Sequence, residues 1–297
     1  MILAAGLGTR LRPLTLSRPK ALIPVGNRPL IDWTIEYLQG HGIGRIIVNA
    51  HHYHVQIVRY LDRGRPFGTP MEVRVEPEIL GTGGGIRNTA DFWDDASFVV
   101  INGDILTDIN LSEAYRAHVE SGALATLVLH HCAPFNQIQI NASLRITDIA
   151  DSTHPGRLAF TGIHILNPEI LDHLPEGVFS SIVDCYRALI RKGAPLRAFI
   201  SKGHYWCDVG TIQSYVLANK EFVKAEPFLL GPHCWLHPQA TLKGWAVVGK
   251  NAVLEERAKV KNSILWDHVK IKEGVKVTDS IVTSWREVES DLVGAVA

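Results

Sequence analysis

The chain is poor in cysteine and contains no long apolar run. Its four cysteines lie far apart, and no two of them form a Cys-x-x-Cys pair. This spacing argues against a zinc site or a disulfide framework and is typical of reduced thiols in a cytosol. No apolar run approaches the ~20 residues of a membrane-spanning helix, and Arg10 and Arg12 interrupt any signal-peptide core. We therefore expect a cytoplasmic protein with no membrane partner.

The chain also lacks an excess of charge of either sign. Its 30 basic residues balance its 30 acidic residues, so the formal net charge at pH 7 is zero. Such a balance gives no electrostatic reason to expect a nucleic-acid partner or a membrane surface. The 297 residues, 46% of them hydrophobic, are enough for one large globular domain or two ordinary ones.

Strand-like and helix-like segments alternate over residues 1–226. Solid apolar runs at 46–48 and 98–101 predict buried strands, and apolar residues at helical spacing in 31–38 and 55–61 predict helices. This order predicts the α/β class, with a Rossmann-like, mostly parallel sheet and helices on both faces. Ligands of such sheets bind at the carboxyl ends of the strands.

The hydrophobic period changes to six near residue 230. Six apolar residues keep this step, and three more continue it after one step that is a residue shorter: Leu230, Leu236, Leu242, Val248, Leu254, Val260, Leu265, Ile271 and Val277. A hexapeptide period indicates a parallel β-helix, in which each coil stacks its apolar residue on the last. We predict two domains, 1–226 and 227–297, the second a short left-handed β-helix.

The segment after the first strand combines glycines with cations. Gly6 and Gly8 let backbone N–H groups approach a ligand closely, and several such groups in one turn form an anion-binding nest. Four cationic side chains follow in this segment: Arg10, Arg12, Arg18 and Lys20. Leu11 replaces the third glycine of a dinucleotide-binding turn, and no Gly-Lys-Ser/Thr of a P-loop is present. The pattern favours a polyphosphate ligand but matches neither of those motifs.

Asp104 follows a buried apolar strand in the run Val-Ile-Asn-Gly-Asp. Asn-Gly-Asp is a common turn sequence, so a purely structural role is one interpretation. A carboxylate at the end of a buried strand can also hold a hard cation, because oxygen ligands suit Mg²⁺.

The run from Gly6 to Thr15, followed by Pro19 and Lys20, resembles the signature of the sugar-phosphate nucleotidylyltransferases, also called NDP-sugar pyrophosphorylases. The run Trp-Cys-Asp-Val-Gly-Thr at 206–211 resembles a second motif of that family. The resemblance extends over nearly the whole chain. It implies that Asp104 and a second acid, Asp208, bind Mg²⁺ as the cofactor.

The resemblance also implies roles for other residues. Arg10, Lys20 and Asp104 would be catalytic, with Arg10 neutralising a leaving pyrophosphate and Lys20 steadying the α-phosphate or the sugar phosphate. The nucleotide would contact a set of small residues: Leu3, Ala4, Ala5, Gly6, Gly8, Thr9, Gly81, Thr82 and Gly83. Glu76, or alternatively Glu78, could accept hydrogen bonds from guanine. The sugar would contact a third set: Thr126, Thr161, Gly162 and Asp184.

One feature of the family is missing. Many members carry a Glu-Lys-Pro whose lysine binds the sugar 1-phosphate. The matching region, 148–157, contains only Arg157 as a cation, and Lys202 is another basic residue that could take the role. The sequence leaves open which of these, or which other base, replaces the lysine.

The resemblance implies an enzyme that makes an NDP-sugar and pyrophosphate from a nucleoside triphosphate and a sugar 1-phosphate. It is nearest to the guanylyltransferases of mannose 1-phosphate and heptose 1-phosphate. The alternatives are a uridylyltransferase acting on N-acetylmuramate 1-phosphate or another hexose 1-phosphate, and a non-catalytic regulatory subunit that binds an NDP-sugar. We also expect a homo-oligomer, because the end strands of a β-helix need covering.

Overall fold

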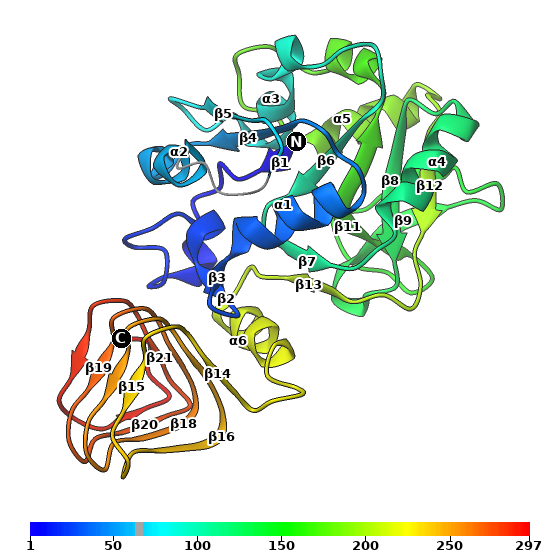
Figure 1. The fold of residues 1–297 in the computed structure, drawn as a ribbon. Coiled ribbons are helices and arrows are strands. Elements are labelled where there is room, and N and C mark those ends of the chain that lie inside the picture. Colours follow the sequence, from blue (N-terminus) through cyan, green and yellow to red (C-terminus); the bar gives the residue numbers. More distant parts are fainter. Residues whose placement is uncertain (63–67) are drawn as a thin grey trace. The chain divides into compact units, whose positions relative to one another are not determined.

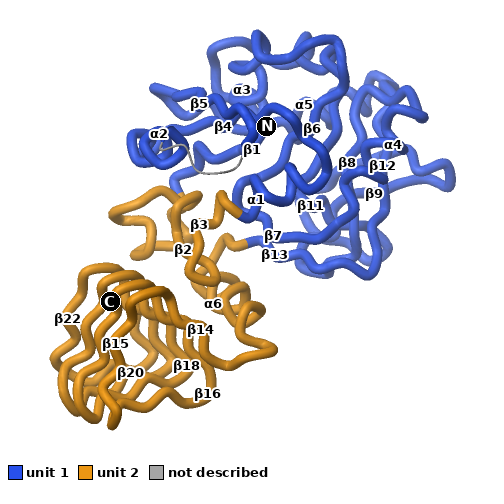
Figure 2. The backbone as a smooth tube through the Cα atoms, in the orientation of Figure 1, with its two compact units in different colours: residues 1–7, 33–208 blue, residues 8–32, 209–297 orange. Residues whose placement is uncertain are grey.

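Backbone contacts divide the computed structural model, which describes residues 1–62 and 68–297, into two units (Figure 2). The first unit comprises Met1–Leu7 and Trp33–Asp208, and the second comprises Gly8–Asp32 and Val209–Ala297. All residues predicted to form the β-helix lie in the second unit. The cation-rich segment from Gly8 onward also belongs to the second unit, so the two compact units do not follow a single division near residue 226.

A nine-stranded sheet organises the first unit (Figure 1). At one side, four parallel strands lie in the order β5 (Met71–Val75), β4 (Ile46–Ala50), β1 (Ile2–Leu3) and β6 (Phe98–Asn102). Their side chains are mostly apolar and buried, as expected for strands covered on both faces. The predicted Rossmann-like parallel sheet is therefore confirmed.

The rest of the sheet is arranged around an antiparallel strand, β11 (Leu158–Leu166), which pairs with β6. β11 also pairs with β8 (Ala125–His130), which is parallel to β12 (Leu196–Ile200). The start of β11 pairs with β9 (Asn136–Ile140), which forms a hairpin with β10 (Ile146–Ile149). A separate two-stranded pair consists of β7 (Ile105–Thr107) and β13 (Trp206–Asp208). The antiparallel direction of β11 departs from the parallel order that was predicted from the sequence.

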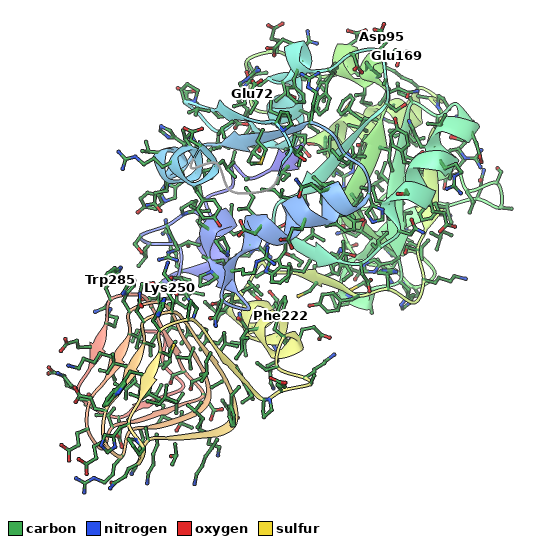
Figure 3. The ribbon with its side chains drawn as sticks, viewed as in Figure 1. Glu72, Asp95, Glu169, Phe222, Lys250 and Trp285 are labelled. Atoms are coloured by element: carbon green, nitrogen blue, oxygen red, sulfur yellow. The ribbon has the colours of Figure 1, made fainter. Side chains whose placement is uncertain are left out.

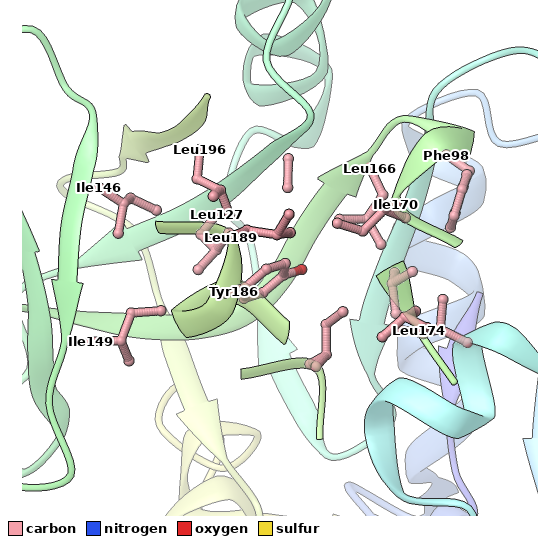
Figure 4. Close-up of a cluster of buried hydrophobic side chains, with 14 of the residues drawn as sticks. Phe98, Leu127, Ile146, Ile149, Leu166, Ile170, Leu174, Tyr186, Leu189 and Leu196 are labelled. Atoms are coloured by element: carbon pink, nitrogen blue, oxygen red, sulfur yellow. The ribbon is translucent and has the colours of Figure 1, made fainter. Parts of the chain in front are cut away.

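Several helices contribute buried side chains to the first unit. They are α1 (Leu30–Gly40), which crosses in front of the strands in Figure 1, α2 (His54–Asp62), α3 (Gly81–Arg87), α4 (Leu111–Ser121) and α5 (Ile182–Arg191). Tyr186 and Leu189 of α5 pack with Leu127 of β8 in a buried cluster (Figure 4). Burying side chains of this size stabilises the fold by about 1.5–3 kcal/mol each.

Parallel strands coil through the second unit from Phe228 onward. One sheet contains β14 (Phe228–Leu230), β16 (Thr241–Val248), β18 (Lys259–Leu265), β20 (Lys276–Thr278), β21 (Ile281–Val282) and β23 (Leu292–Val293). Another contains β15 (Trp235–Leu236), β17 (Val253–Leu254), β19 (Lys270–Ile271) and β22 (Glu287–Val288). Partners are 18 residues apart at Phe228 and Ala246 but 17 apart at Val253 and Lys270. This register agrees with the hexapeptide period and with its single shortened step.

The hexad residues form the core of the β-helix. Six of the nine are fully buried: Val248, Leu254, Val260, Leu265, Ile271 and Val277. Leu230, the first, is 45% exposed because it lies at the open end of the coil. The chain turns at positions with a left-handed backbone, among them Asn251, Asn262 and Asp279 (φ +49° to +55°). Asn and Asp tolerate this conformation better than other residues with a Cβ.

The second unit also contains the segment before α1 and a helix before the β-helix. The segment forms two 3₁₀ turns, η1 (Thr9–Leu11) and η2 (Lys20–Leu22), and a hairpin of β2 (Pro24–Val25) and β3 (Arg28–Pro29). Helix α6 (Ile212–Glu221) starts with a capping box between Thr211 and Ser214. Among the described residues, no helix has the length and apolar character that crossing a membrane requires.

Candidate functional site

The first strand of the sheet ends in an exposed glycine turn. The N–H of Ala4 donates to Oδ1 of Asn49 at 2.7 Å, and the N–H of Gly103 donates to the carbonyl of Leu3 at 2.9 Å. These bonds fix the end of β1 between β4 and β6. A Cβ on Gly6 would meet no described atom within 4 Å. The backbone at Gly6 is thus open, as a phosphate-binding turn requires.

Gly8 needs glycine for a different reason. Its φ is +63°, and a Cβ there would lie 2.9 Å from Cγ2 of Thr15. The Thr15 hydroxyl donates to the Gly8 carbonyl at 2.8 Å and closes the turn. The conformation brings the chain into η1, where Arg10 is exposed. Gly8 therefore shapes the loop that presents Arg10.

The structure brings Asp104 and Asp208 together. Strands β7 and β13 are antiparallel, and their register pairs Asp208 with Ile105, the residue next to Asp104. The Oδ1 atoms of both acids are buried, and both residues have further interactions within the chain. Two hard oxygen donors at neighbouring positions suit Mg²⁺. No cluster of three acidic, histidine or cysteine ligands occurs in the described part of the chain, so other ligands would have to come from substrate and water.

Trp206 fixes the strand that carries Asp208. Its indole N–H donates to the carbonyl of Thr161 in β11 at 2.9 Å. Its ring meets the edges of His130 and Phe135, with centroids 4.6 and 6.0 Å apart. The Trp-x-Asp spacing therefore has a physical reason: the tryptophan attaches β13 to the sheet, and the acid two residues later is held beside β7.

His130 is a buried residue whose ring contacts that of Trp206. It is only 6% exposed, and its Nδ1 lies 3.2 Å from Nε2 of His204. Burial, with smaller contributions from His204 and His131, lowers the pKa of His130 to about 4. The ring is therefore neutral near pH 7. A solvated loop is the ordinary expectation for adjacent histidines, and only the course of β8 reveals that the His130 side chain points inward.

The glycine run of α3 is packed against protein. A Cβ on Gly81 would lie 2.6 Å from the Ser180 carbonyl, one on Gly83 would lie 2.7 Å from Ser180 Oγ, and one on Gly84 would lie 2.5 Å from the Val178 carbonyl. The Thr82 hydroxyl accepts a hydrogen bond from the Ile182 N–H at 3.0 Å. These contacts explain the glycines without a ligand, so the predicted nucleotide contacts of Gly81, Thr82 and Gly83 gain no support from their surroundings.

Glu76 also makes contacts within the protein. It is 1% exposed; its Oε1 accepts from Asn49 Nδ2 at 2.7 Å, and its Oε2 accepts from the Leu80 N–H at 3.1 Å. Since Asn49 also binds Ala4, this carboxylate connects the end of β1 to the start of α3. The structure therefore favours a positioning role for Glu76 over the predicted contact with guanine. Glu78, the alternative acceptor, is exposed.

The predicted sugar contacts fall into different environments. The Thr126 hydroxyl lies 2.8 Å from Nδ1 of the buried His118, and the Thr161 hydroxyl donates to the Val128 carbonyl at 2.8 Å. Both hydroxyls are buried and hydrogen-bonded within the protein, so their surroundings add no support to the predicted sugar contacts. Asp184 is exposed and pairs with Arg187 at 3.1 Å. Gly162 has φ +80° and approaches Asn102 closely.

Neither predicted replacement for the missing lysine has a clear position. Arg157 donates to the carbonyl of Gln137 at 2.9 Å and pairs with Asp148 at 2.7 Å, so it stabilises the β9–β10 hairpin. Lys202 is exposed on the loop after β12. The structure leaves the cation of the sugar-phosphate site unassigned.

The four cations of the signature segment are not equivalent. Arg10 and Arg12 are exposed, whereas Arg18 stacks on the ring of Trp266 in the β-helix. Lys20 starts the 3₁₀ turn η2 and is partly buried. Arg18 therefore differs from the other cations of this segment, because its guanidinium is already held by an aromatic ring.

Alignments with known proteins extend over most of the chain. A UTP–glucose-1-phosphate uridylyltransferase of Synechocystis is 27% identical and aligns with 95% of this chain and 86% of its own length. A mannose-1-phosphate guanylyltransferase of Mycobacterium tuberculosis is 26% identical, with 92% and 81% aligned. An N-acetylmuramate α-1-phosphate uridylyltransferase of Neisseria meningitidis is 32% identical but aligns with 71% of this chain and 93% of its own.

Among solved structures, that of HddC from Yersinia pseudotuberculosis is similar, with a TM-score of 0.64 and 25% identity. It covers 74% of this chain and 97% of that protein. Residues 1–225 match the family described as Nucleotidyl transferase. Because the match extends over most of the chain, and because the glycine turn and paired acids lie within it, the protein belongs to the nucleotidyl transferase family.

Proposed function

We propose that this protein transfers a nucleotidyl group from a nucleoside triphosphate to a sugar 1-phosphate. The observation that carries the proposal is the register of β7 and β13, which puts Asp208 beside Asp104. The exposed position of Gly6 and the open space beside its Cα support it, since a polyphosphate needs room to approach the backbone. The relatives that align with most of the chain are named for this reaction type.

The reaction needs positioning more than proton transfer. A phosphate oxygen of the sugar 1-phosphate attacks the α-phosphorus in line, the new P–O bond forms, and the bond to the β-phosphate breaks. Pyrophosphate leaves with the electron pair. The attacking oxygen is already an anion, so no general base is required. The barrier is repulsion between anions and poor alignment, which fixed cations and N–H donors lower.

The chain's own groups would share this task. Arg10 would neutralise the leaving pyrophosphate, and Lys20 would steady the α-phosphate or the sugar phosphate. The carboxylates of Asp104 and Asp208 would hold Mg²⁺, which when bound supplies positive charge to the phosphate oxygens. Glu76 and Asn49 would keep the end of β1 in place while its backbone amides bind phosphate.

We infer GTP as the nucleotide and mannose 1-phosphate or heptose 1-phosphate as the acceptor. Support comes from guanylyltransferase relatives that align beyond the transferase domain and into the β-helix, such as the one from M. tuberculosis. The Synechocystis uridylyltransferase aligns equally far, so a uridylyltransferase is the second candidate. A non-catalytic NDP-sugar sensor is the third, and the presence of both acids and of Arg10 and Lys20 speaks against it.

A pyrophosphate-release assay separates these candidates. Each of the four common nucleoside triphosphates is tested with mannose, heptose, glucose and N-acetylmuramate 1-phosphates, in the presence of Mg²⁺. Release with GTP and mannose or heptose 1-phosphate supports the proposal, and release with UTP alone supports the second candidate. Binding of an NDP-sugar without release in any combination would identify a sensor.

We also propose that the protein forms a homo-oligomer in the cytoplasm. The support is general: the coil ends in short strands, and a second copy could cover their unpaired backbone groups. Light scattering on the purified chain tests the assembly, and a monomeric mass would contradict it.

A further inference from the structure

Arg18, two residues before Lys20, is held by the β-helix. Its guanidinium carbon lies 4.5 Å from the centroid of the Trp266 ring. Its Nη2 donates to the hydroxyl of Ser284 at 3.2 Å. Burial lowers the pKa of Arg18, and the charge of Asp267 partly offsets this effect. The guanidinium is thus fixed between an aromatic face and a hydroxyl.

The same indole is linked to the chain on the other side of Lys20. Trp266 is only 1% exposed, and its N–H donates to the hydroxyl of Tyr215 in α6 at 2.8 Å. That hydroxyl donates to the carbonyl of Pro24 at 2.8 Å. Trp266 therefore connects to residue 18 through its face and to residue 24 through its N–H, and Lys20 lies between them.

The hairpin that follows is attached as well. The N–H of Gly26 donates to Oδ1 of the buried Asn219 in α6 at 3.0 Å, and the Asn27 amide donates to the carbonyl of Val248 at 2.8 Å. A Cβ on Gly26 would lie 2.8 Å from the ring of Phe222, which is labelled in Figure 3. The segment after Lys20 thus has little room to move within the second unit.

We propose that Trp266 is a positioning residue for Lys20, and that the β-helix contributes to catalysis through it. The inference rests on the proposed role of Lys20 in nucleotidyl transfer. A 3₁₀ turn of three residues, such as η2, has little stability of its own. Its orientation therefore depends on the burial of Ala21 and Leu22 and on the anchors on either side. Arg18 acts as one of these anchors and does not bind phosphate.

The test combines Trp266→Leu, Arg18→Met and Lys20→Ala in a double-mutant cycle. Trp266→Leu and Arg18→Met should each lower kcat by roughly 10- to 100-fold, since small misplacements of a catalytic group reduce rates strongly. In a Lys20→Ala background, either substitution should have little further effect, because the group they position is gone. Effects that multiply would overturn the proposal.

A second cation–aromatic pair of the same unit provides the matched control. Nζ of Lys220 lies 5.6 Å from the centroid of the Trp245 ring, so this pair joins α6 to the β-helix. Neither residue makes a hydrogen bond to the signature segment among the described residues. Lys220→Met and Trp245→Leu should leave kcat unchanged. An equal loss in both pairs would show that disturbing the β-helix in general lowers activity, and would overturn the specific role of Trp266.

Two further measurements cover folding and function. Trp266→Phe keeps a ring for Arg18 and removes the N–H donor, so it should fold and retain an intermediate kcat. Amide exchange of residues 18–24 should accelerate in Arg18→Met and Trp266→Phe, and this readout needs no activity. Unchanged exchange would overturn the proposal.

The activities separate the two levels of the argument. If Lys20→Ala turns over like the wild type, the proposed role of Lys20 in catalysis fails. If Lys20→Ala loses activity while the Trp266 and Arg18 variants turn over like the wild type, the proposed positioning of Lys20 by Trp266 fails. A raised KM for the nucleotide in Arg18→Met alone would instead make Arg18 a phosphate ligand.

Discussion

The indole N–H of Trp206 donates to the carbonyl of Thr161, 2.9 Å away, and so connects the strand of Asp208 to the central sheet. This bond lies inside the protein, where an unpaired carbonyl destabilises by about 1–3 kcal/mol. The position of Asp208 beside Asp104 therefore depends on a residue that carries no charge. The first prediction follows from this dependence.

Trp206→Phe should weaken Mg²⁺ binding. The phenyl ring keeps the packing against His130 but cannot donate to Thr161, so β13 keeps its pairing with β7 and loses its bond to β11. We expect a roughly ten-fold rise in the Mg²⁺ concentration that gives half-maximal activity, in the range seen when groups supporting metal ligands are removed. A Mg²⁺ titration measures this, with the exposed Trp235→Phe as control. Equal titration curves would contradict the prediction.

Asp104→Asn and Asp208→Asn should each lower kcat by about 10²–10³-fold, the loss typical of removing one electrostatic stabiliser. Binding of Mn²⁺, a spectroscopic substitute for Mg²⁺, should fall in parallel and can be followed by electron paramagnetic resonance without substrate. Asp95→Asn, an exposed acid labelled in Figure 3, is the control. Wild-type Mn²⁺ binding by both variants would remove the metal site from the proposal.

Two glycine substitutions should behave in opposite ways. Gly6→Ala introduces a Cβ into open space, so stability should be unchanged, while KM for the nucleotide rises because the methyl group obstructs the turn. Gly85→Ala places its Cβ 2.7 Å from Nδ2 of Asn49 and 2.9 Å from Oε1 of Glu76. This overpacking should destabilise the fold by about 1–3 kcal/mol. Thermal denaturation of both variants checks the stability, and equal midpoints would be the contrary result.

Stability should fall in mild acid. Burial lowers the pKa of His130 to about 4 and that of His164 to about 3, both below the usual histidine pKa of about 6.5. Below pH 6.5 these two histidines bind protons in the unfolded chain but stay neutral in the folded chain. The free energy of unfolding therefore decreases as pH falls from about 6.5 towards 4. For His130 the loss by pH 5 is about 2 kcal/mol. Denaturation midpoints between pH 7.5 and 4.5 measure it.

A His130→Asn, His164→Gln double variant provides the comparison for this pH series. It should be less stable than the wild type at pH 7.5 but should lose less stability on acidification, since two proton-binding groups of the unfolded chain are absent. Parallel curves for the two proteins would show that other groups cause the acid sensitivity.

Repetition made the β-helix predictable from sequence. The apolar period of six recurs from Leu230 to Val277, and even its shortened step appears as the change from 18 to 17 residues in strand register. The parallel part of the sheet was predictable because buried strands alternate with amphipathic helices. The direction of β11 was not, since a buried strand has the same hydrophobic pattern in either direction.

The candidate site was predictable only in part, for a physical reason. Glycines and charged residues look alike in sequence whether their partner is a ligand or the protein itself. Gly83 and Glu76 fit a nucleotide site by type, yet their neighbours are Ser180 and Asn49. Arg18 fits a phosphate site by type, yet its partner is a tryptophan far away in the chain. Such partners become visible only when the chain is folded.

The β-helix can tolerate added coils only towards its carboxyl end. Trp266 and Ser284 lie on successive coils, and each coil pairs only with its neighbours. Duplicating a whole coil after Ser284 would lengthen the β-helix and leave Trp266 and Ser284 against Arg18. Duplicating one before Trp266 would shift the tryptophan along the axis by about 4.8 Å, the spacing between paired strands. Evolutionary insertions in homologues that keep this arginine–tryptophan pair should therefore accumulate towards the carboxyl end.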